Sequence, residues 1–204
     1  MIELYTANTP NGIKIPIALE ELAVPYDLRM IELGSADLRS ADYLQINPNA
    51  KIPAIRHLAN DATPVTVFES GAILLYLAQA YDGLMGTTPT ARAQTLSWLF
   101  LQVAGLGPMM GNAAHFRSRT PSDPYAVGRF EGEVARHLGM IEARLRDVEW
   151  LNGESYSIAD IAHFSWIRSA SYAGFDLKDF PVLKAWVEKI EVRPATVRAL
   201  ARLS

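Results

Sequence analysis

The chain has 204 residues, 50% of them hydrophobic and 20% charged, which is the composition of an ordinary globular protein with one large core or two smaller ones. Its formal net charge of −3 provides no basic field, so nucleic acid and anionic membrane surfaces are poor partners for the chain as a whole. The sequence contains no cysteine, which excludes disulfides, thiolate metal sites and a redox thiol carried by the protein itself.

The start of the chain predicts a βαβ unit. Residues 2–5 are apolar and partly alternating, as in a strand, and residues 6–11 are rich in Asn, Thr and Pro, as in a loop. From Gly12 the apolar residues recur at helical spacing, with Asn11 in the position of a helix cap. Residues 26–31 then predict a second strand, and a βαβ crossover makes the two strands parallel.

The next segment predicts two further strands and a helix. Residues 32–49 have a weak pattern that allows only a short irregular helix. Residues 53–56 and 65–68 predict two strands, joined through a turn at Asn60-Asp61, and the Ala- and Leu-rich residues 72–81 predict a helix. A βαβ unit followed by a ββα unit is the order of the thioredoxin fold.

The sequence changes character after the predicted helix. Residues 83–88 are rich in Gly and Thr and look like a linker, with Thr88 as cap and Pro89 as the first residue of the helix that follows. Everything beyond has helical periodicity, although the glycines and the proline of residues 105–108 are expected to bend or break the first long helix. We therefore predict an α/β domain over residues 1–82 and an all-helical domain over residues 88–204.

Glu69 and Ser70 lie at the predicted turn from the last strand into its helix. The first backbone N–H groups of a helix have no internal partner, and together with the helix dipole they favour an anion. The Ser70 hydroxyl adds a further donor, and the Glu69 carboxylate can hold an ammonium group. The pair therefore suits one end of an amino acid, although Ser70 by itself is equally well explained as a helix N-cap.

The Lys51-Ile52-Pro53 tripeptide is a second candidate feature. A proline has no N–H to give to a sheet, so Pro53 belongs at the entry or edge of a strand. If the Ile52-Pro53 bond is cis, the Ile52 backbone is turned outward and can pair with an extended, peptide-like ligand.

These motifs resemble those of a known family. Residues 47–54 (NPNAKIPA) and 68–77 (FESGAILLYL) resemble the thioredoxin-fold domain of glutathione transferases. Residues 9–12 (TPNG), 98–100 (WLF) and 105–109 (GLGPM) resemble its nu-class, disulfide-bond-reductase-like branch, and the resemblance covers almost the whole chain. It implies a thioredoxin-like domain followed by an all-helical glutathione-transferase domain, a cis proline, and a homodimer.

The resemblance also implies the groups that would activate glutathione. The nucleophile is the thiolate, and a free thiol titrates at about pH 8.5, so the site must lower its pKa. Thr9 and Asn11 can donate hydrogen bonds to the sulfur and stabilise its charged form. From the residues alone, Asn11 is more simply a helix cap and Thr9 a turn hydroxyl. Tyr5, which other transferase classes would use, is expected to belong to the core.

The remaining site residues are likewise implied by the resemblance. The backbone of Ile52, beside Pro53, would pair with the cysteinyl residue of glutathione, and Glu69 and Ser70 would hold its γ-glutamyl end. Lys51 would pair with the glycyl carboxylate and Arg129 would contact the ligand; otherwise both are ordinary surface residues. The branch has a glutamine where this chain has Leu38, so that contact is lost or moved to Arg39. The predicted substrate pocket consists of His115, Phe116, Trp166 and Tyr172, each of which is otherwise a core aromatic.

The function predicted is a glutathione-dependent disulfide-bond reductase that binds glutathione or its disulfide. Conjugation of glutathione to a small electrophile, peroxide reduction, and a non-catalytic glutathione-binding regulatory module are the alternatives. The four histidines lack a metal-ligand spacing, so no metal is predicted. The chain begins without a secretory signal and has no apolar run approaching about 18 residues, which makes the cytoplasm the expected location. The Ser157-Ile158-Ala159-Asp160 segment has the form of a capping box and is assigned to folding.

Overall fold

A computed structural model describes residues 1–58 and 63–204, which form two compact units. The first consists of Met1–Gly83 and Arg193–Ser204, and the second of Leu84–Val192. The sequence prediction assigned the whole of 88–204 to the helical domain, whereas the contacts group the last twelve residues, Arg193–Ser204, with the first unit. The reason is that helix α9 (Pro194–Ala201) packs on helix α1 (Lys14–Glu21).

Charged side chains accompany this packing of α9 on α1. The Arg193 guanidinium donates to both carboxylate oxygens of Glu21, at 2.6 and 2.8 Å, which is the bidentate geometry that Arg favours. Arg198 donates to Glu20 at 2.7 Å. Hydrophobic periodicity locates α9 in the sequence but does not indicate which partner its apolar face covers.

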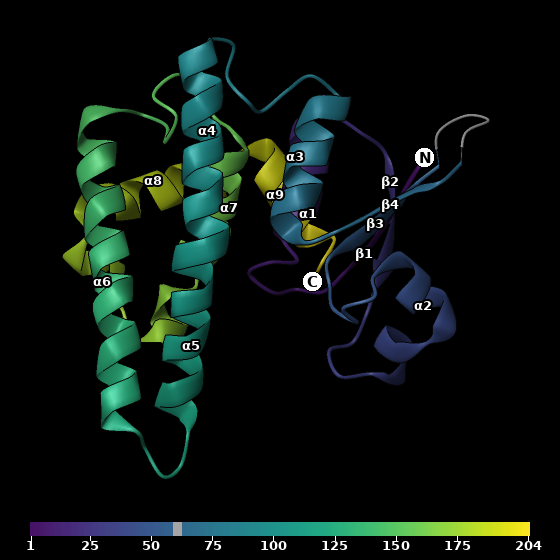
Figure 1. Ribbon diagram of the computed structural model, residues 1–204. Coiled ribbons are helices and arrows are strands. Elements are labelled where there is room, and N and C mark those ends of the chain that lie inside the picture. Colours follow the sequence, from purple (N-terminus) through teal and green to yellow (C-terminus); the bar gives the residue numbers. More distant parts are fainter. Residues whose placement is uncertain (59–62) are drawn as a thin grey trace. The chain divides into compact units, whose positions relative to one another are not determined.

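The first unit contains a four-stranded sheet in the order β2-β1-β3-β4. Strands β1 and β2 are parallel, and the other two pairings are antiparallel. The strands are β1 (Ile2–Thr6), β2 (Tyr26–Met30), β3 (Ala54–His57) and β4 (Val65–Phe68). This confirms the predicted thioredoxin-like order. The strands are labelled in Figure 1. The turn predicted at Asn60-Asp61 lies outside the described residues.

Helices cover both faces of this sheet. Helices α1 and α3 (Ser70–Ala80) pack against each other, and the short helices η1 (Ala36–Arg39) and α2 (Ala41–Ile46) lie on the other face (Figure 1). Under α2 a buried cluster consists of Ile31, Leu38, Tyr43, Ile46 and Ala54, with Tyr5 and Ile52 packed against it. Tyr5 is thus part of the packing, as predicted, and its hydroxyl donates to Glu3 at 3.3 Å.

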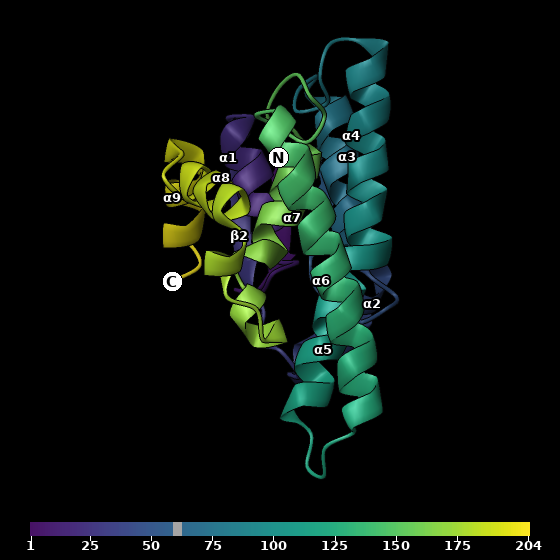
Figure 2. The ribbon, with the colours of Figure 1, turned by 90° about the vertical axis from the view of Figure 1, so that its left-hand side faces the viewer.

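The second unit is helical, as predicted. Its elements are α4 (Pro89–Leu101), η2 (Gln102–Leu106), α5 (Gly107–Ser118), α6 (Pro124–Asp147), α7 (Ile158–Ile167), η3 (Ala170–Ala173), η4 (Leu177–Asp179) and α8 (Pro181–Glu191). Figures 1 and 2 show α5 and α6 side by side. Thr88 accepts a hydrogen bond from the Ala91 backbone and caps α4, as expected.

At residues 105–108, where the helix was expected to bend or break, the structure has a change in helical geometry. Helix α4 continues through η2, a π-helical turn, directly into α5. Pro108, in the first turn of α5, has no N–H to give to the preceding helical turn, and the regular α-helical pattern changes to the π-helical turn just before it. At Gly105 an added Cβ would lie 2.7 Å from the His137 Nε2 atom on α6, so this glycine permits the close approach of η2 and α6.

Helix α7 forms the core of the second unit, and all of its residues except Trp166 are buried. The capping box predicted at its start is present. The Ser157 backbone and hydroxyl both donate to the Asp160 Oδ2 atom, at 3.0 and 2.8 Å, and the Leu151 backbone donates to Oδ1 at 2.9 Å. Asp160 therefore ties the preceding loop to the helix start.

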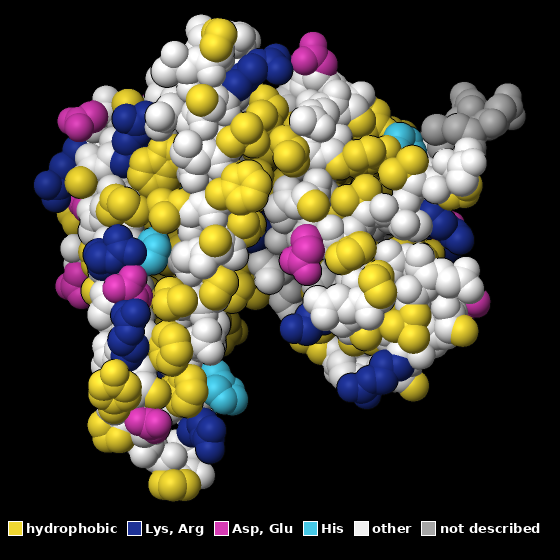
Figure 3. Space-filling view, viewed as in Figure 1, with side chains coloured by type: hydrophobic (Ala, Val, Ile, Leu, Met, Phe, Trp, Pro, Cys, Tyr) yellow, Lys and Arg dark blue, Asp and Glu magenta, His cyan; other side chains and the backbone are white. Residues whose placement is uncertain are grey.

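The surface has no single dominant charge on the face shown in Figure 3, where Lys and Arg side chains are interspersed with Asp and Glu. This pattern agrees with the small net charge of −3. Within the described residues, none of the helices is long and apolar enough to cross a membrane.

Candidate functional site

The strand register brings three predicted site segments to one edge of the sheet, the edge where β1 and β4 end and β3 begins. Tyr5 at the end of β1 lies opposite Ala54 at the start of β3, and Ala54 lies opposite Phe68 at the end of β4. The loop after β1, the tripeptide before β3 and the turn after β4 therefore meet at this edge. All three belong to the first unit.

The loop after β1 is held closed by hydroxyl groups. The Thr6 hydroxyl donates to the Gly12 carbonyl at 2.9 Å, and the Gly12 backbone donates to the Thr9 Oγ1 atom at 3.0 Å. The Thr9 hydroxyl oxygen is thus fixed by accepting a backbone hydrogen bond, while its own hydrogen can be donated elsewhere. An added Cβ at Gly12 would lie 2.0 Å from the Ala7 carbonyl oxygen, so only glycine fits here.

Asn11 is not the cap of helix α1. The residue that precedes this helix is Ile13, and it makes no capping hydrogen bond through its side chain. The Asn11 Oδ1 atom instead accepts a hydrogen bond from the Lys14 Nζ atom at 2.9 Å. The alternative explanation of Asn11 as a cap was therefore wrong.

Lys14 is a residue of this site that sequence reasoning missed. It is only 1% exposed, and its Nζ atom donates to the Ser70 Oγ atom at 3.2 Å as well as to Asn11. Burial lowers the pKa of Lys14 to about 7, although the negative charge of Glu69 opposes this shift. The available signal was a lysine between isoleucines in the otherwise apolar first half of a helix.

The tripeptide before β3 is positioned by two polar side chains. The Tyr43 hydroxyl and the Asn47 Nδ2 atom both donate to the Lys51 carbonyl, each at 2.6 Å. Asn47 also accepts from the Asn49 backbone at 2.9 Å, an Asx turn that the Asn-Pro-Asn sequence could have indicated. The Ile52-Pro53 peptide bond is cis, as the resemblance implied. The Lys51 side chain is exposed.

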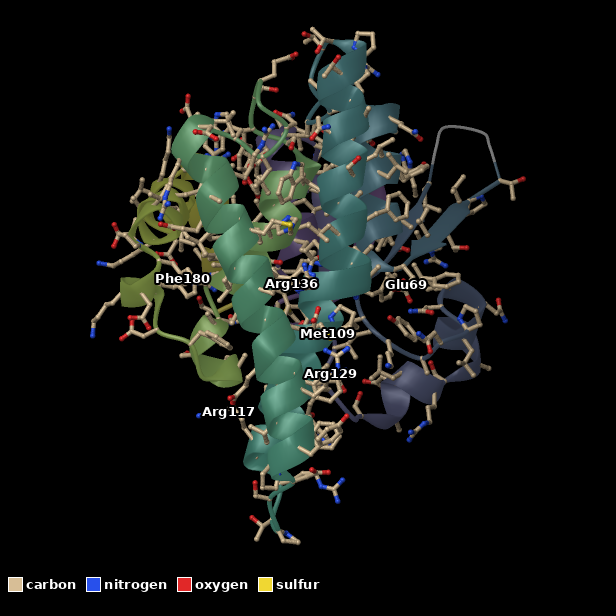
Figure 4. The ribbon with its side chains drawn as sticks, turned by 60° about the vertical axis from the view of Figure 1, so that its left-hand side comes forward. Glu69, Met109, Arg117, Arg129, Arg136 and Phe180 are labelled. Atoms are coloured by element: carbon tan, nitrogen blue, oxygen red, sulfur yellow. The ribbon has the colours of Figure 1, made fainter. Side chains whose placement is uncertain are left out.

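The turn after β4 has an unusual backbone. Glu69 precedes helix α3 with φ 70° and ψ 120°, a region that residues other than glycine rarely adopt. Its side chain is exposed at the start of α3 (Figure 4). Ser70 is buried and is the first residue of α3, so Glu69 and not Ser70 occupies the cap position. The simpler explanation of Ser70 as an N-cap was wrong.

Arg129 belongs to the second unit, on helix α6. Its side chain is 59% exposed, and its Nη1 atom lies 3.3 Å from the Glu133 carboxylate. Arg136 pairs with the same carboxylate at 2.9 Å, and Figure 4 shows both arginines on α6. The Arg136 and Arg129 guanidinium groups lower the pKa of the Glu133 carboxyl. Arg129 therefore lies on an exposed, charged stretch of this helix.

The four residues of the predicted substrate pocket also belong to the second unit. His115 and Phe116 are neighbours on α5 with ring centroids 5.2 Å apart, and Phe116 stacks on Phe130 of α6 at 5.3 Å. Trp166 on α7 lies against the glycines of α5, where a Cβ at Gly111 would be 3.4 Å from its ring. Tyr172, in η3, is 73% exposed, so it is not a core aromatic.

The part of the chain that the structure describes shows no set of side chains arranged to bind a metal ion. No group of three or more His, Cys, Asp or Glu side chains there could hold a metal ion. The polar groups gathered at the edge of the sheet are instead hydroxyl, amide, ammonium and carboxylate groups. Such groups can bind a small zwitterionic ligand and donate hydrogen bonds to an anion.

These features are those of one class of protein: a thioredoxin-like domain with a cis proline and a cluster of polar groups, followed in sequence by a helical domain. The family models agree with this class. The N-terminal domain of glutathione S-transferase matches residues 10–80, and the C-terminal domain of glutathione S-transferase matches residues 109–194. The chain belongs to the glutathione S-transferase family.

Several relatives match this chain over nearly its full length. The chain is 44% identical to the disulfide-bond oxidoreductase YfcG of Escherichia coli K12, over 99% of this chain and 95% of YfcG. A glutathione transferase family member from Pseudomonas fluorescens Pf-5, solved with two glutathione molecules bound, has a TM-score of 0.91 and 38% identity, covering 98% of this chain and 92% of that one. A glutathione transferase from Pseudomonas putida, solved with one glutathione disulfide bound per subunit, has a TM-score of 0.90 and 35% identity, covering 98% and 90%.

Proposed function

We propose that this protein is a glutathione-dependent disulfide-bond reductase in which Thr9 and Asn11 stabilise the glutathione thiolate. The observation that carries the proposal is the loop after β1, which presents a hydroxyl and an amide at the edge where the cis-proline tripeptide and the Glu69-Ser70 turn also lie. Similarity to YfcG and to structures with bound glutathione or its disulfide supports the same activity.

The reaction requires that glutathione supply all the reacting sulfur, because the chain has no cysteine. A glutathione thiolate attacks one sulfur of the substrate disulfide RS–SR, which forms the mixed disulfide GS–SR and releases RS⁻. A second glutathione thiolate attacks the glutathione sulfur of GS–SR, which forms GSSG and releases the second RS⁻. The leaving thiolates take up the protons that the two glutathione thiols lost, so two GSH and RSSR give GSSG and two RSH.

Thr9 and Asn11 would increase the fraction of bound glutathione that is present as the thiolate. A hydrogen bond to a charged group contributes about 1.5–3 kcal/mol, and one pKa unit corresponds to about 1.4 kcal/mol. Each donor that bonds the sulfur would thus lower the thiol pKa by about one to two units. From a starting value near 8.5, the two donors together are enough to make thiolate the main form at neutral pH.

The rest of the glutathione molecule would be held by the other groups at this edge. The Glu69 carboxylate would pair with the γ-glutamyl ammonium, and the Ser70 hydroxyl with the α-carboxylate at the N-terminus of α3. The Ile52 backbone beside Pro53 would pair with the cysteinyl residue, and Lys51 with the glycyl carboxylate. Arg129 would add a charged contact to the ligand in the assembled homodimer. The dimer and a cytoplasmic location are themselves part of the proposal.

The test measures reduction of hydroxyethyl disulfide by glutathione, coupled to NADPH oxidation through glutathione reductase. Thr9→Val removes the hydroxyl at nearly constant shape, and Asn11→Ala removes the amide, so we expect kcat/KM to fall about tenfold or more in each. Thr9→Ser, which keeps the hydroxyl, should retain most activity, and Tyr5→Phe should match the wild type. Wild-type rates in both Thr9→Val and Asn11→Ala would refute the mechanism.

The same variants separate the proposed activity from the alternatives. Calorimetric titration with reduced and oxidised glutathione measures binding without turnover. Tight binding with no reduction of disulfides would favour a regulatory module. Faster turnover with an aryl halide or an organic peroxide than with any disulfide would favour conjugation or peroxide reduction.

A further inference from the structure

We propose that Lys14 is a positioning residue that orients the Asn11 amide and the Ser70 hydroxyl, so that both groups present hydrogen-bond donors to glutathione. This inference rests on the proposed function. Lys14 lies in the first turn of α1 and contacts both Asn11, in the loop after β1, and Ser70, at the start of α3. Asn11 would serve the thiolate, and Ser70 would serve the γ-glutamyl carboxylate.

In its charged form Lys14 carries an ammonium group, which has only donors and no acceptor. An amide group has one acceptor side and one donor side, which can exchange by a flip of the side chain. Because Lys14 donates to the Asn11 Oδ1 atom at 2.9 Å, the Nδ2 side of this amide must face away from Lys14. The orientation with Nδ2 toward Lys14 would place two donors against each other.

Lys14 constrains the Ser70 hydroxyl in the same way. Its Oγ atom accepts the second hydrogen bond from Lys14, at 3.2 Å, so its own hydrogen is not spent on Lys14. A hydroxyl that already accepts is left to act as a donor to another group. Lys14 thus favours the donor role of both side chains, and an anionic ligand requires donors.

The burial of Lys14 is costly, which indicates that its ammonium group serves a purpose here. Its side chain is 1% exposed, and the neighbouring Ile13, Ile15 and Ile17 are equally buried. A buried ammonium costs free energy unless it is paired and hydrogen-bonded, whereas an apolar side chain of similar volume would fill the space without that cost. The lowered pKa, about 7, expresses this cost. Anions bound nearby would favour the charged form of Lys14.

The experiment replaces Lys14 with methionine, which has a similar length and no N–H group. The pKa of the bound glutathione thiol is measured from the ultraviolet absorbance of the thiolate as a function of pH. Glutathione affinity is measured by calorimetric titration, and thermal unfolding checks the fold. In Lys14→Met we expect the bound thiol pKa to rise by about one unit and the Kd to rise about tenfold. If Lys14→Met does not fold, Lys14→Leu, which also lacks an N–H group, takes its place with the same expectations.

Double-mutant cycles distinguish a positioning role of Lys14 from a merely structural one, because only in a positioning role are the effects of the two mutations non-additive. If Lys14 acts through Asn11, the thiol pKa in Lys14→Met/Asn11→Ala should equal that in Asn11→Ala alone. If it acts through Ser70, the loss of affinity in Lys14→Met/Ser70→Ala should equal that in Ser70→Ala alone. Additive effects in both cycles, or an unchanged thiol pKa and Kd in Lys14→Met, would overturn the inference.

The two proposals fail in different ways. A wild-type protein that binds glutathione and lowers its thiol pKa, with Lys14→Met behaving identically, leaves the proposed function intact and removes the role of Lys14. A wild-type protein that leaves the thiol pKa of bound glutathione at its value in solution removes the proposed function, and the role of Lys14 with it.

Discussion

Glu69 is the residue at which stability and ligand binding are expected to change in opposite directions. It adopts φ 70° and ψ 120° at the start of α3. A residue other than glycine in such a sparsely populated region costs about 1–3 kcal/mol. Glycine has no such penalty, although its freedom in the unfolded chain costs about 0.5–1 kcal/mol. Glu69→Gly should therefore stabilise the folded chain by about 1 kcal/mol, which raises Tm by about 2–4 °C for a chain of this length.

The matched control is Glu69→Ala, which removes the same carboxylate but keeps a Cβ and therefore the backbone strain. Both variants lose the proposed contact with the γ-glutamyl ammonium, a charge-assisted bond worth about 1.5–3 kcal/mol. Glutathione should therefore bind about tenfold or more weakly to both, as measured by calorimetric titration. Differential scanning calorimetry without ligand should separate them, with only Glu69→Gly above the wild type.

Two results would contradict this reasoning. A lower Tm for Glu69→Gly than for Glu69→Ala would mean that the backbone at this position is not strained. An unchanged glutathione affinity in both variants would mean that the carboxylate does not contact the ligand.

Two further predictions concern the loop after β1 and the core of the helical unit. Gly12→Ala would place a Cβ 2.0 Å from the Ala7 carbonyl oxygen, so the loop must shift, and kcat/KM should fall about a hundredfold; wild-type kinetics would show that the loop is not fixed. Burial raises the pKa of Asp160 to about 6 from 3.8, against the hydrogen bonds that Leu151 and Ser157 donate. Because the folded pKa is the higher one, the proton stabilises the folded chain fully below about pH 4, and this stabilisation is lost as pH rises through about 6. The unfolding free energy of the wild type minus that of Asp160→Asn should therefore fall between pH 4 and 6 in urea titrations, and a constant difference would contradict the assignment.

Local signals in the sequence were sufficient to predict the order of the elements and the strand ends beside which the candidate site lies. The helices and strands of the βαβ and ββα units follow from periodicity within short segments, and the Thr88 cap of α4 and the Ser157-Asp160 capping box are hydrogen bonds between residues three apart. For the same reason, Pro53 and Glu69 could be singled out as neighbours of strand ends before their contacts were known. The cis Ile52-Pro53 bond followed from the family resemblance and not from the residues themselves.

The tertiary structure decided what depends on residues distant in sequence. Lys14 meets Ser70 across 56 positions, so hydrophobic periodicity could only show an unexplained lysine on an apolar face. The positive φ of Glu69 has no sequence signal, because glutamate is not a residue type that favours it.

Helix α9 belongs to the first unit because it packs on α1, and Arg193 and Arg198 there pair with Glu21 and Glu20 near the start of the chain. Periodicity along the chain was thus enough to predict the strands and the long helices, and the loop sequences showed which residue types were available at the site. Only the folded chain decided which of these groups face each other, because the free energy of those contacts depends on distances in space and not on spacing along the chain.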